Sequence, residues 1–138
     1  MKRLVVDASV IAAVFLQDVY AEAAKALIGS GRELHAPDLI YAELASAVWK
    51  SRRRGEIDRE EAQRLLEDFM TASLRITPCV KLVGRALDIA LETGRTVYDC
   101  LYLALAVETG SVMVTGDRRL VNSLARTPLV KYVAWIGD

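Results

Sequence analysis

The sequence predicts an α/β protein, a three-layer α/β/α sandwich built around a central, mostly parallel sheet. Helix-like stretches alternate with short β-branched runs, which is the pattern of strands joined by crossover helices. The 138 residues fit one domain, residues 1–138, because no linker or internal repeat divides them. Hydrophobic residues make up 53% of the chain, which is enough to fill a sizeable core.

Short apolar runs predict the strands of this sheet. The predicted strands cover residues 4–6, 33–36, 74–77, 112–115 and 130–135. Asp7 directly follows the first of them, and Asp117 comes just after the fourth. Because ligands of such folds bind beyond the carboxyl ends of the strands, both carboxylates are expected at the same edge of the sheet.

Apolar periodicity and end signals predict the helices. They are expected from Asp7 to about 16, over 21–28, from Pro37 to about 54, from Asp58 onward, over 82–91, from 97 to Gly110, and from Asp117. Pro37 and Asp38 are expected to open the third helix, because proline suits a first turn. Asp58 and Glu61 have the spacing of a capping box. The helix that follows them is expected to place Phe69 and Met70 on its apolar face.

Composition excludes several classes of protein. The net formal charge is +0, so nucleic-acid contacts must come from local patches rather than from a basic surface. The two cysteines, Cys79 and Cys100, are too few for a disulfide scaffold and lack zinc spacing. Reduced thiols are expected, with one bridge between them left open. No apolar run reaches the ~18 residues of a membrane span, so we expect a cytoplasmic protein with no membrane partner.

Four acidic residues have ordinary structural explanations when each is taken alone. Asp7 and Asp117 can cap the helices that follow them, Asp99 can complete a capping arrangement with Thr96, and Glu43 can be an exposed helix residue. Together they are harder to explain, since Asp99 heads an apolar helix and Glu43 has mostly apolar neighbours. Carboxylates gathered at one edge would repel one another, and a cation would remove that repulsion. Oxygen donors without histidine or cysteine suit Mg²⁺ or Mn²⁺, ions that typically act on phosphate esters.

The sequence resembles the PIN-domain ribonucleases, and most closely the VapC-type toxins of toxin–antitoxin pairs. The resemblance rests on VVDASV, the glutamate in PDLIYAELASAVWK, TVYDCLYLALA and VTGDRRL, which follow in the family's order and span essentially the whole chain. It implies a PIN-like fold, an RNA substrate, a homodimer and a small antitoxin protein that blocks the site. It also implies an acidic metal site of Asp7, Glu43, Asp99 and Asp117, supported by the hydroxyls of Ser9, Thr96 and Thr115.

The resulting hypothesis is a Mg²⁺- or Mn²⁺-dependent endoribonuclease that cleaves RNA phosphodiester bonds by in-line attack of water. Asp7 and Asp99 are the expected direct ligands, whereas the roles of Glu43 and Asp117, and the number of ions, are left open. Exposed basic residues near these acids are candidates for RNA contact. They are Arg52, Arg53, Arg118 and Arg119.

The other polar and aromatic residues have simpler expectations. His35 is expected to be structural, and Tyr98 is the one aromatic considered near substrate. Tyr41, Trp49 and Phe69 are expected to pack in the core or in a dimer interface.

Two other functions stay open at this point. A non-catalytic PIN-like binding module would use the acids at a partner interface, although intact acids at all four positions argue against it. A phosphoryl-transfer domain with Asp7 as nucleophile would need a second aspartate two residues later, where Ser9 stands.

Overall fold

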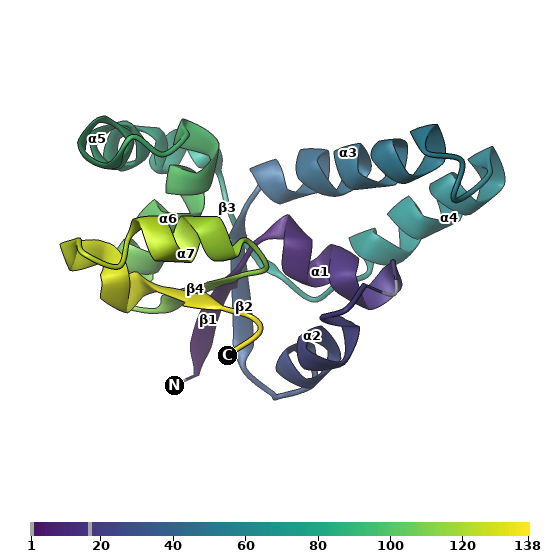
Figure 1. The fold of residues 1–138 in the computed structure, drawn as a ribbon, viewed down its shortest axis with the longest axis horizontal. Helices are drawn as coiled ribbons and strands as arrows, with labels where there is room; N and C mark the ends of the chain where they lie inside the picture. The colour runs from purple at the N-terminus through teal and green to yellow at the C-terminus, as the bar shows by residue number, and fades with distance from the viewer. Residues whose placement is uncertain (1, 17) are drawn as a thin grey trace.

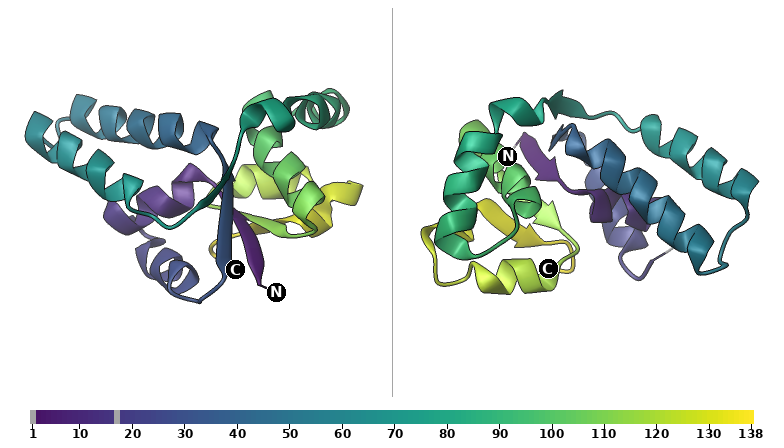
Figure 2. Two further views of the ribbon diagram at one scale, coloured as in Figure 1. Left: turned by 180° about the vertical axis from the view of Figure 1, so that it is seen from behind. Right: turned by 90° about the horizontal axis from the view of Figure 1, so that it is seen from above.

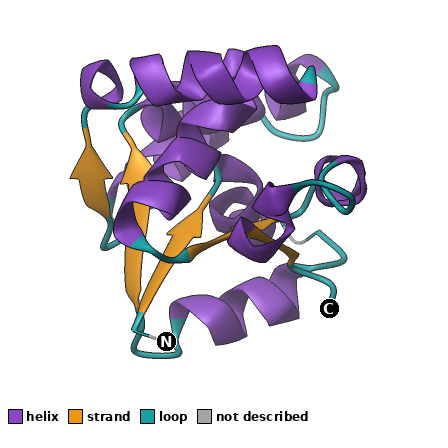
Figure 3. Cartoon of the chain, turned by 90° about the vertical axis from the view of Figure 1, so that its left-hand side faces the viewer, coloured by secondary structure: helices purple, strands orange, loops and turns teal. Residues whose placement is uncertain are grey.

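The computed structural model describes residues 2–16 and 18–138, and within them five parallel strands form one sheet with helices on both faces (Figure 1, Figure 3). The strands are β1 (Arg3–Val6), β2 (Glu33–Pro37), β3 (Arg75–Thr77), β4 (Val112–Thr115) and β5 (Val133–Trp135). The α-helices are α1 (Ala8–Phe15), α2 (Ala21–Ile28), α3 (Leu39–Arg53), α4 (Arg59–Met70), α5 (Val83–Thr93), α6 (Val97–Thr109) and α7 (Arg118–Ser123). Two 3₁₀ helices, η1 (Cys79–Lys81) and η2 (Pro128–Tyr132), complete the description. The predicted three-layer α/β/α fold is confirmed.

The strand order creates a topological switch point at the middle of the sheet. The order is β3-β2-β1-β4-β5, so the chain first moves outward from β1 and later returns to its other side. Connections therefore leave β1 and β4 in opposite directions, which is the arrangement that opens a binding crevice at the carboxyl ends. Val6 pairs with Val114, so Asp7, which follows β1, lies beside Thr115, the last residue of β4.

Different helices cover the two faces of the sheet. Helices α1 to α4 lie on one side, and α5 and α6 lie on the other (Figure 1, Figure 2). Helices α3 and α4 run next to each other as a hairpin that extends beyond the sheet (Figure 2). Within the described ranges, no helix is both long and apolar enough to cross a bilayer.

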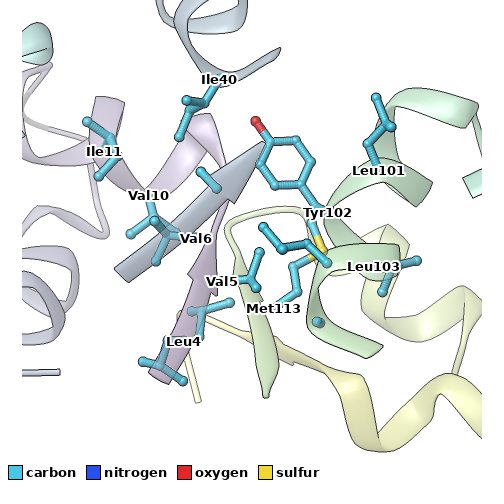
Figure 4. Packing of buried hydrophobic residues seen from close by; sticks show 14 of the residues in the cluster. Leu4, Val5, Val6, Val10, Ile11, Ile40, Leu101, Tyr102, Leu103 and Met113 are labelled. Atoms are coloured by element: carbon cyan, nitrogen blue, oxygen red, sulfur yellow. The ribbon is translucent and has the colours of Figure 1, made fainter. Parts of the chain in front are cut away.

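Helix α6 forms the centre of the core. Every residue from Cys100 to Ala106 is buried, and the helix packs on β1, β2 and β4. In Figure 4 the Met113 side chain of β4 lies between Val5 of β1 and the part of α6 that carries Tyr102 and Leu103. Each large apolar side chain buried in this way contributes about 1.5–3 kcal/mol to stability. The predicted interior position of α6 is confirmed.

The expected place of Pro37 in a first helical turn is wrong. Pro37 is the last residue of β2 and pairs with Thr77 of β3. The Asp38 N–H donates to the Thr77 carbonyl at 3.1 Å, which extends the strand pairing past the proline. Helix α3 consequently begins at Leu39, with Asp38 as its N-cap residue.

Two other element predictions need correction. The strand expected over residues 130–135 forms only at Val133–Trp135, because Pro128 begins a 3₁₀ helix that takes up the preceding residues. Met70 does not share the buried face of Phe69. Its exposed fraction is 53% while that of Phe69 is 0%, since neighbouring helical residues point about 100° apart.

Candidate functional site

Asp7 lies at the carboxyl end of β1, beside Thr115 at the end of β4. It is the N-cap residue of α1, and its carboxylate accepts the N–H groups of Ser9 at 3.1 Å and Val10 at 3.4 Å. The capping explanation for Asp7 is therefore correct. The same carboxylate also accepts hydrogen bonds from the hydroxyls of Ser9 and Thr115, which a helix cap does not need.

Two hydroxyl groups orient the two oxygens of Asp7. The Ser9 hydroxyl donates to Oδ1 of Asp7 and accepts the Gly116 N–H at 2.9 Å. The Thr115 hydroxyl donates to Oδ2 at 2.5 Å and accepts the Asp117 N–H at 3.0 Å. These bonds join the loop after β4 to the loop after β1. A Cβ atom at Gly116 would lie 3.0 Å from Ser9 Oγ, so glycine allows the close approach of the two loops.

Glu43 reaches the site from the second turn of α3. Its Oε1 accepts a hydrogen bond from the hydroxyl of Tyr102 in α6. Tyr102 is 2% exposed, and Figure 4 shows its hydroxyl directed toward the helix that carries Ile40. The sequence analysis did not single out Tyr102. The available signal was its position one turn after Asp99 in an apolar helix, because a buried tyrosine hydroxyl requires a partner.

Asp99 and Asp117 lie at the N-terminal ends of helices. Thr96 caps α6 by accepting the Asp99 N–H at 3.1 Å, so the expected capping role of Thr96 is confirmed. Asp117 caps α7 by accepting the N–H of Arg119 at 3.0 Å. A helix N-terminus carries partial positive charge, which favours both carboxylates where they are.

Burial and mutual repulsion act on these acids. Desolvation by burial raises the pKa of Asp7, although the hydrogen bonds from Ser9 and Thr115 oppose that shift. Burial also raises the pKa of Glu43, and the charges of Asp7 and Asp99 raise it further. Burial and then the charge of Asp117 raise the pKa of Asp99. Glu43 is thus close enough to Asp7 and Asp99 for their charges to repel, and Asp99 is close enough to Asp117.

The carboxylates do not yet form a closed set of metal ligands. Among residues 2–16 and 18–138, no three aspartate, glutamate, histidine or cysteine groups converge as a ready-made metal centre. The expectation that all four side chains already meet in one pocket is therefore not met, and sharing one ion would require side-chain rotation. The chemistry still fits a hard divalent ion. The donors are all oxygens, they repel one another, and none forms an ion pair within the described part of the chain.

The candidate arginines lie in different surroundings. Arg52 and Arg53 are about 14 Å along α3 from Glu43, at the far end of the hairpin, so they do not lie beside the acids. The Arg53 guanidinium lies 5.2 Å from the ring centroid of Trp49. Trp49 is 55% exposed, so of its two expected places the core of this chain is excluded and a dimer interface stays a prediction.

Arg118 and Arg119 begin α7, directly after Asp117. The guanidinium carbon of Arg118 lies over the ring of Trp135, 4.6 Å from the ring centroid. Tyr98 neighbours Asp99 and is exposed, as a residue that meets substrate would have to be.

The remaining candidates have structural roles. His35 Nε2 lies 2.7 Å from Oε1 of Glu33 within β2, so it stays a structural histidine. Cys79 and Cys100 are both free thiols, which resolves the bridge that was left open. Phe69 packs edge-on against Phe15 with ring centroids 5.1 Å apart, as expected for a core residue.

Comparison with known proteins agrees with this architecture. The family model described as PIN domain matches residues 4–125. Ribonuclease VapC3 from Pyrobaculum aerophilum is 38% identical over 122 residues, which cover 87% of this chain and 93% of that protein.

Solved structures share the fold as well. The crystal structure of PAE2754 from Pyrobaculum aerophilum superposes with a TM-score of 0.73 at 27% identity, over 98% of this chain and 84% of that one. The structure of VapBC2 from Rickettsia felis, bound to a DNA fragment from its promoter, gives a TM-score of 0.65 at 17% identity. That alignment covers 96% of this chain and 98% of that one, and it supports the fold alone.

Proposed function

Because the chain belongs to the PIN-domain family, we propose that it is a metal-dependent endoribonuclease and the toxin of a toxin–antitoxin pair. One observation carries the proposal. The carboxylate of Asp7 lies at the carboxyl ends of β1 and β4, both its oxygens are oriented by hydroxyls, and the charge of Glu43 lies close by. An aspartate that only caps a helix requires neither the hydrogen bond from the Thr115 hydroxyl nor a nearby acid such as Glu43. The similarity to a protein named ribonuclease supports RNA as the substrate.

The acids would hold Mg²⁺ or Mn²⁺, the ions that match an all-oxygen donor set. The residues that would hold the ion are Asp7, Glu43, Asp99 and Asp117. When bound, such an ion supplies a Lewis acid that activates water and offsets charge on the phosphodiester. The chain itself prepares the ligands, because Ser9 and Thr115 orient Asp7 and Tyr102 orients Glu43.

The phosphodiester would lie across the carboxyl ends of β1 and β4. Asp7 and Asp99 would face the scissile bond, and Glu43 or Asp117 would orient the attacking water. Of the candidate arginines, Arg119 begins a helix beside the acids and is exposed, so it can reach an adjacent phosphate.

Site-directed variants test this function. Asp7→Asn and Asp99→Asn should each reduce cleavage of single-stranded RNA with Mn²⁺ by at least about 100-fold, because loss of even an indirect metal partner typically costs about 10–100-fold. Asp88→Asn is the matched control, since Asp88 is an exposed aspartate of α5 with no role in the site. Cleavage of a circular RNA separates endonuclease from exonuclease action. If both site variants cleave normally, the protein is a non-catalytic binding module.

A small antitoxin protein is the proposed partner. The resemblance of the sequence to VapC-type toxins carries this proposal, and the Rickettsia felis structure shows that a chain of the same fold occurs in a VapBC assembly. Co-expression with the product of a neighbouring short gene should yield a complex without ribonuclease activity. A neighbouring product that neither binds nor inhibits the protein would remove it as the antitoxin.

The homodimer would form through the exposed side of α5. Apolar side chains follow one another there at helical spacing, while the opposite side of the helix is buried. They are Val83, Leu87 and Leu91 of α5, and the exposed Val80 of η1 precedes them. Contiguous apolar surface of this kind marks a protein contact, and a second copy is the simplest partner.

Charge placed in this apolar stripe tests the dimer. Leu87→Asp should convert the dimer to a monomer in analytical ultracentrifugation, because association would bury an unpaired carboxylate. Val19→Asp is the control, since Val19 is 89% exposed and lies outside the stripe. A wild-type chain that sediments as a monomer would refute the homodimer.

A further inference from the structure

Arg95 is a half-buried cation in the short connection between α5 and α6. It immediately precedes Thr96, the N-cap residue of α6, and stands four residues before Asp99. Gly94 ends α5 in the left-handed conformation with φ of 72°, and the Arg95 N–H donates to the Thr93 hydroxyl at 3.2 Å. These contacts fix the backbone from which the Arg95 side chain extends.

The Arg95 side chain has an unused hydrogen-bond donor. Its Nε is buried and has no acceptor among the described residues. Buried donors of folded proteins are nearly always paired, so an unpaired guanidinium nitrogen indicates a ligand that completes it. An arginine presents its donors in a planar fork, and the natural acceptor for that fork is a carboxylate or a phosphate.

The Arg95 charge lies near the acidic site but is not neutralised there. Arg95 is joined directly to the N-cap residue of α6, and its charge opposes the rise that burial causes in the pKa values of Asp99 and Cys100. Arg95 takes part in none of the ion pairs of the described residues. Its guanidinium nitrogens therefore lie more than 4.0 Å from every carboxylate oxygen in that part of the chain. A cation beside the acids with a donor still unpaired can therefore accept an anion from outside.

We infer that Arg95 binds a phosphate of the RNA beside the scissile bond, through the fork of its guanidinium. The inference rests on the proposed function, which supplies the phosphodiester. Of the other candidate arginines, Arg119 remains exposed at the start of α7, and the remaining three are less suited to this place. Arg118 is stacked over Trp135, and Arg52 and Arg53 lie at the far end of α3.

RNA binding by the full-length chain tests the inference. In an Asp7→Asn background that cannot cleave, fluorescence anisotropy with a labelled single-stranded RNA is measured over a range of salt concentrations. Arg95→Met should weaken binding by roughly 10-fold and reduce the slope of log K against log salt by about 0.7, the value for one lost phosphate contact on a single strand. Arg95→Lys should restore the slope but only part of the affinity, because an ammonium group lacks the fork. Arg126→Met, which removes an exposed arginine beyond α7, is the control.

Two further measurements separate substrate binding from a structural role. With the otherwise unchanged enzyme, Arg95→Met should raise KM about 10-fold and change kcat less, since the contact is to a phosphate that does not react. In the absence of RNA it should tighten Mn²⁺ binding, because a positive charge beside Asp99 is removed. Weaker Mn²⁺ binding together with a lower melting temperature would overturn the inference, since both would follow from damage to the start of α6.

The outcomes distinguish this inference from the function on which it rests. If the wild-type chain cleaves RNA and Arg95→Met has the same affinity, salt slope and KM, the inference about Arg95 fails and the nuclease proposal stands. If the wild-type chain neither binds nor cleaves RNA, both fail.

Discussion

The hydroxyl of Tyr102 determines where a carboxylate points. It is the polar end of a side chain that is otherwise enclosed by α6 and the sheet, and its acceptor is Glu43. Burial and the neighbouring Glu43 charge raise the pKa of Tyr102 far above its ordinary value, so the hydroxyl keeps its proton and remains a donor. Tyr102 is therefore a positioning residue that acts on the site through Glu43.

Tyr102→Phe tests this role. Removing the hydroxyl frees Glu43 to turn away from its repelling neighbours, so Mn²⁺ affinity and cleavage should each fall about 10–100-fold. The ring still fills the core, so stability should fall by only about 1 kcal/mol in urea denaturation. Tyr41→Phe is the control in α3, because the Tyr41 hydroxyl makes no hydrogen bond to the described residues. Equal metal affinity in the two variants would contradict the role of Tyr102.

Glu43→Gln tests the repulsion among the acids through pH. The raised pKa of Glu43 means that the folded, ion-free chain binds this proton more tightly than the unfolded chain, whose carboxyl has its ordinary pKa of 4.5. The Glu43 carboxyl should therefore lower the free energy of unfolding of the wild type as pH rises above about 4.5. The Gln variant lacks this carboxyl, so it should not show this decrease. The stability of Glu43→Gln relative to wild type, measured by urea denaturation with a chelator, should increase over that range. A difference that decreases with pH would show that a cation stabilises the Glu43 carboxylate.

At the level of elements, the loop after β4 determines the geometry of the loop after β1. The Thr115 hydroxyl donates to Asp7 directly. The Gly116 N–H donates to the hydroxyl of Ser9 in the first turn of α1, and that hydroxyl donates to Asp7. The two loops consequently behave as one unit, and a change in the later one should reach Asp7.

Gly116→Ala tests this coupling. The added Cβ would lie 3.0 Å from Ser9 Oγ, so Ser9 must shift, and with it the hydrogen bond to Asp7. Cleavage should fall about 10–100-fold, as for loss of an outer partner of a metal ligand. Gly84→Ala is the matched control, because a Cβ at this helical position would meet nothing within 4 Å. Gly84→Ala should raise stability by about 0.5–1 kcal/mol in thermal or urea unfolding and leave Asp7 undisturbed.

Elements whose ends depend on local chemistry could be predicted from the sequence. Asp58 and Glu61 form both hydrogen bonds of the predicted capping box at the start of α4. Gly94 and Gly110 end α5 and α6 in the left-handed conformation that glycine favours. Pro37 was not predictable in this way, because the pairing of β2 with a strand distant in sequence decides its conformation.

In the site, too, some features follow from local sequence patterns and others from contacts between distant residues. The rule for parallel sheets places Asp7 and Asp117 at one edge without any knowledge of side chains. The bond between Tyr102 and Glu43 joins residues 59 positions apart, and no local pattern reports such a contact. Whether four carboxylates converge on one ion depends on side-chain rotation, which sequence spacing does not determine.

For the molecule as a whole, the repelling acidic residues should make the free energy of unfolding depend on divalent ions. Repulsion around Asp7, Glu43 and Asp99 opposes folding of the ion-free chain, and an ion that binds only the folded state offsets it. A concentration of Mn²⁺ near 100 times Kd should stabilise the protein by about 2.7 kcal/mol, or roughly 5–10 °C in melting temperature. Differential scanning fluorimetry with Mn²⁺ and with chelator measures this shift. Asp99→Asn should show a smaller shift, and K⁺ at the same ionic strength should give none.

The hydrogen bond between Thr115 and Asp7 also has a consequence for protein synthesis. Its two residues are 108 positions apart, so the chain that leaves the ribosome contains Asp7 long before it contains the partner that orients this carboxylate. The pairing of β1 with β4 must wait for the same late segment. An enzyme that cuts RNA would thus remain harmless to the messenger and the ribosome that produce it until translation is almost finished.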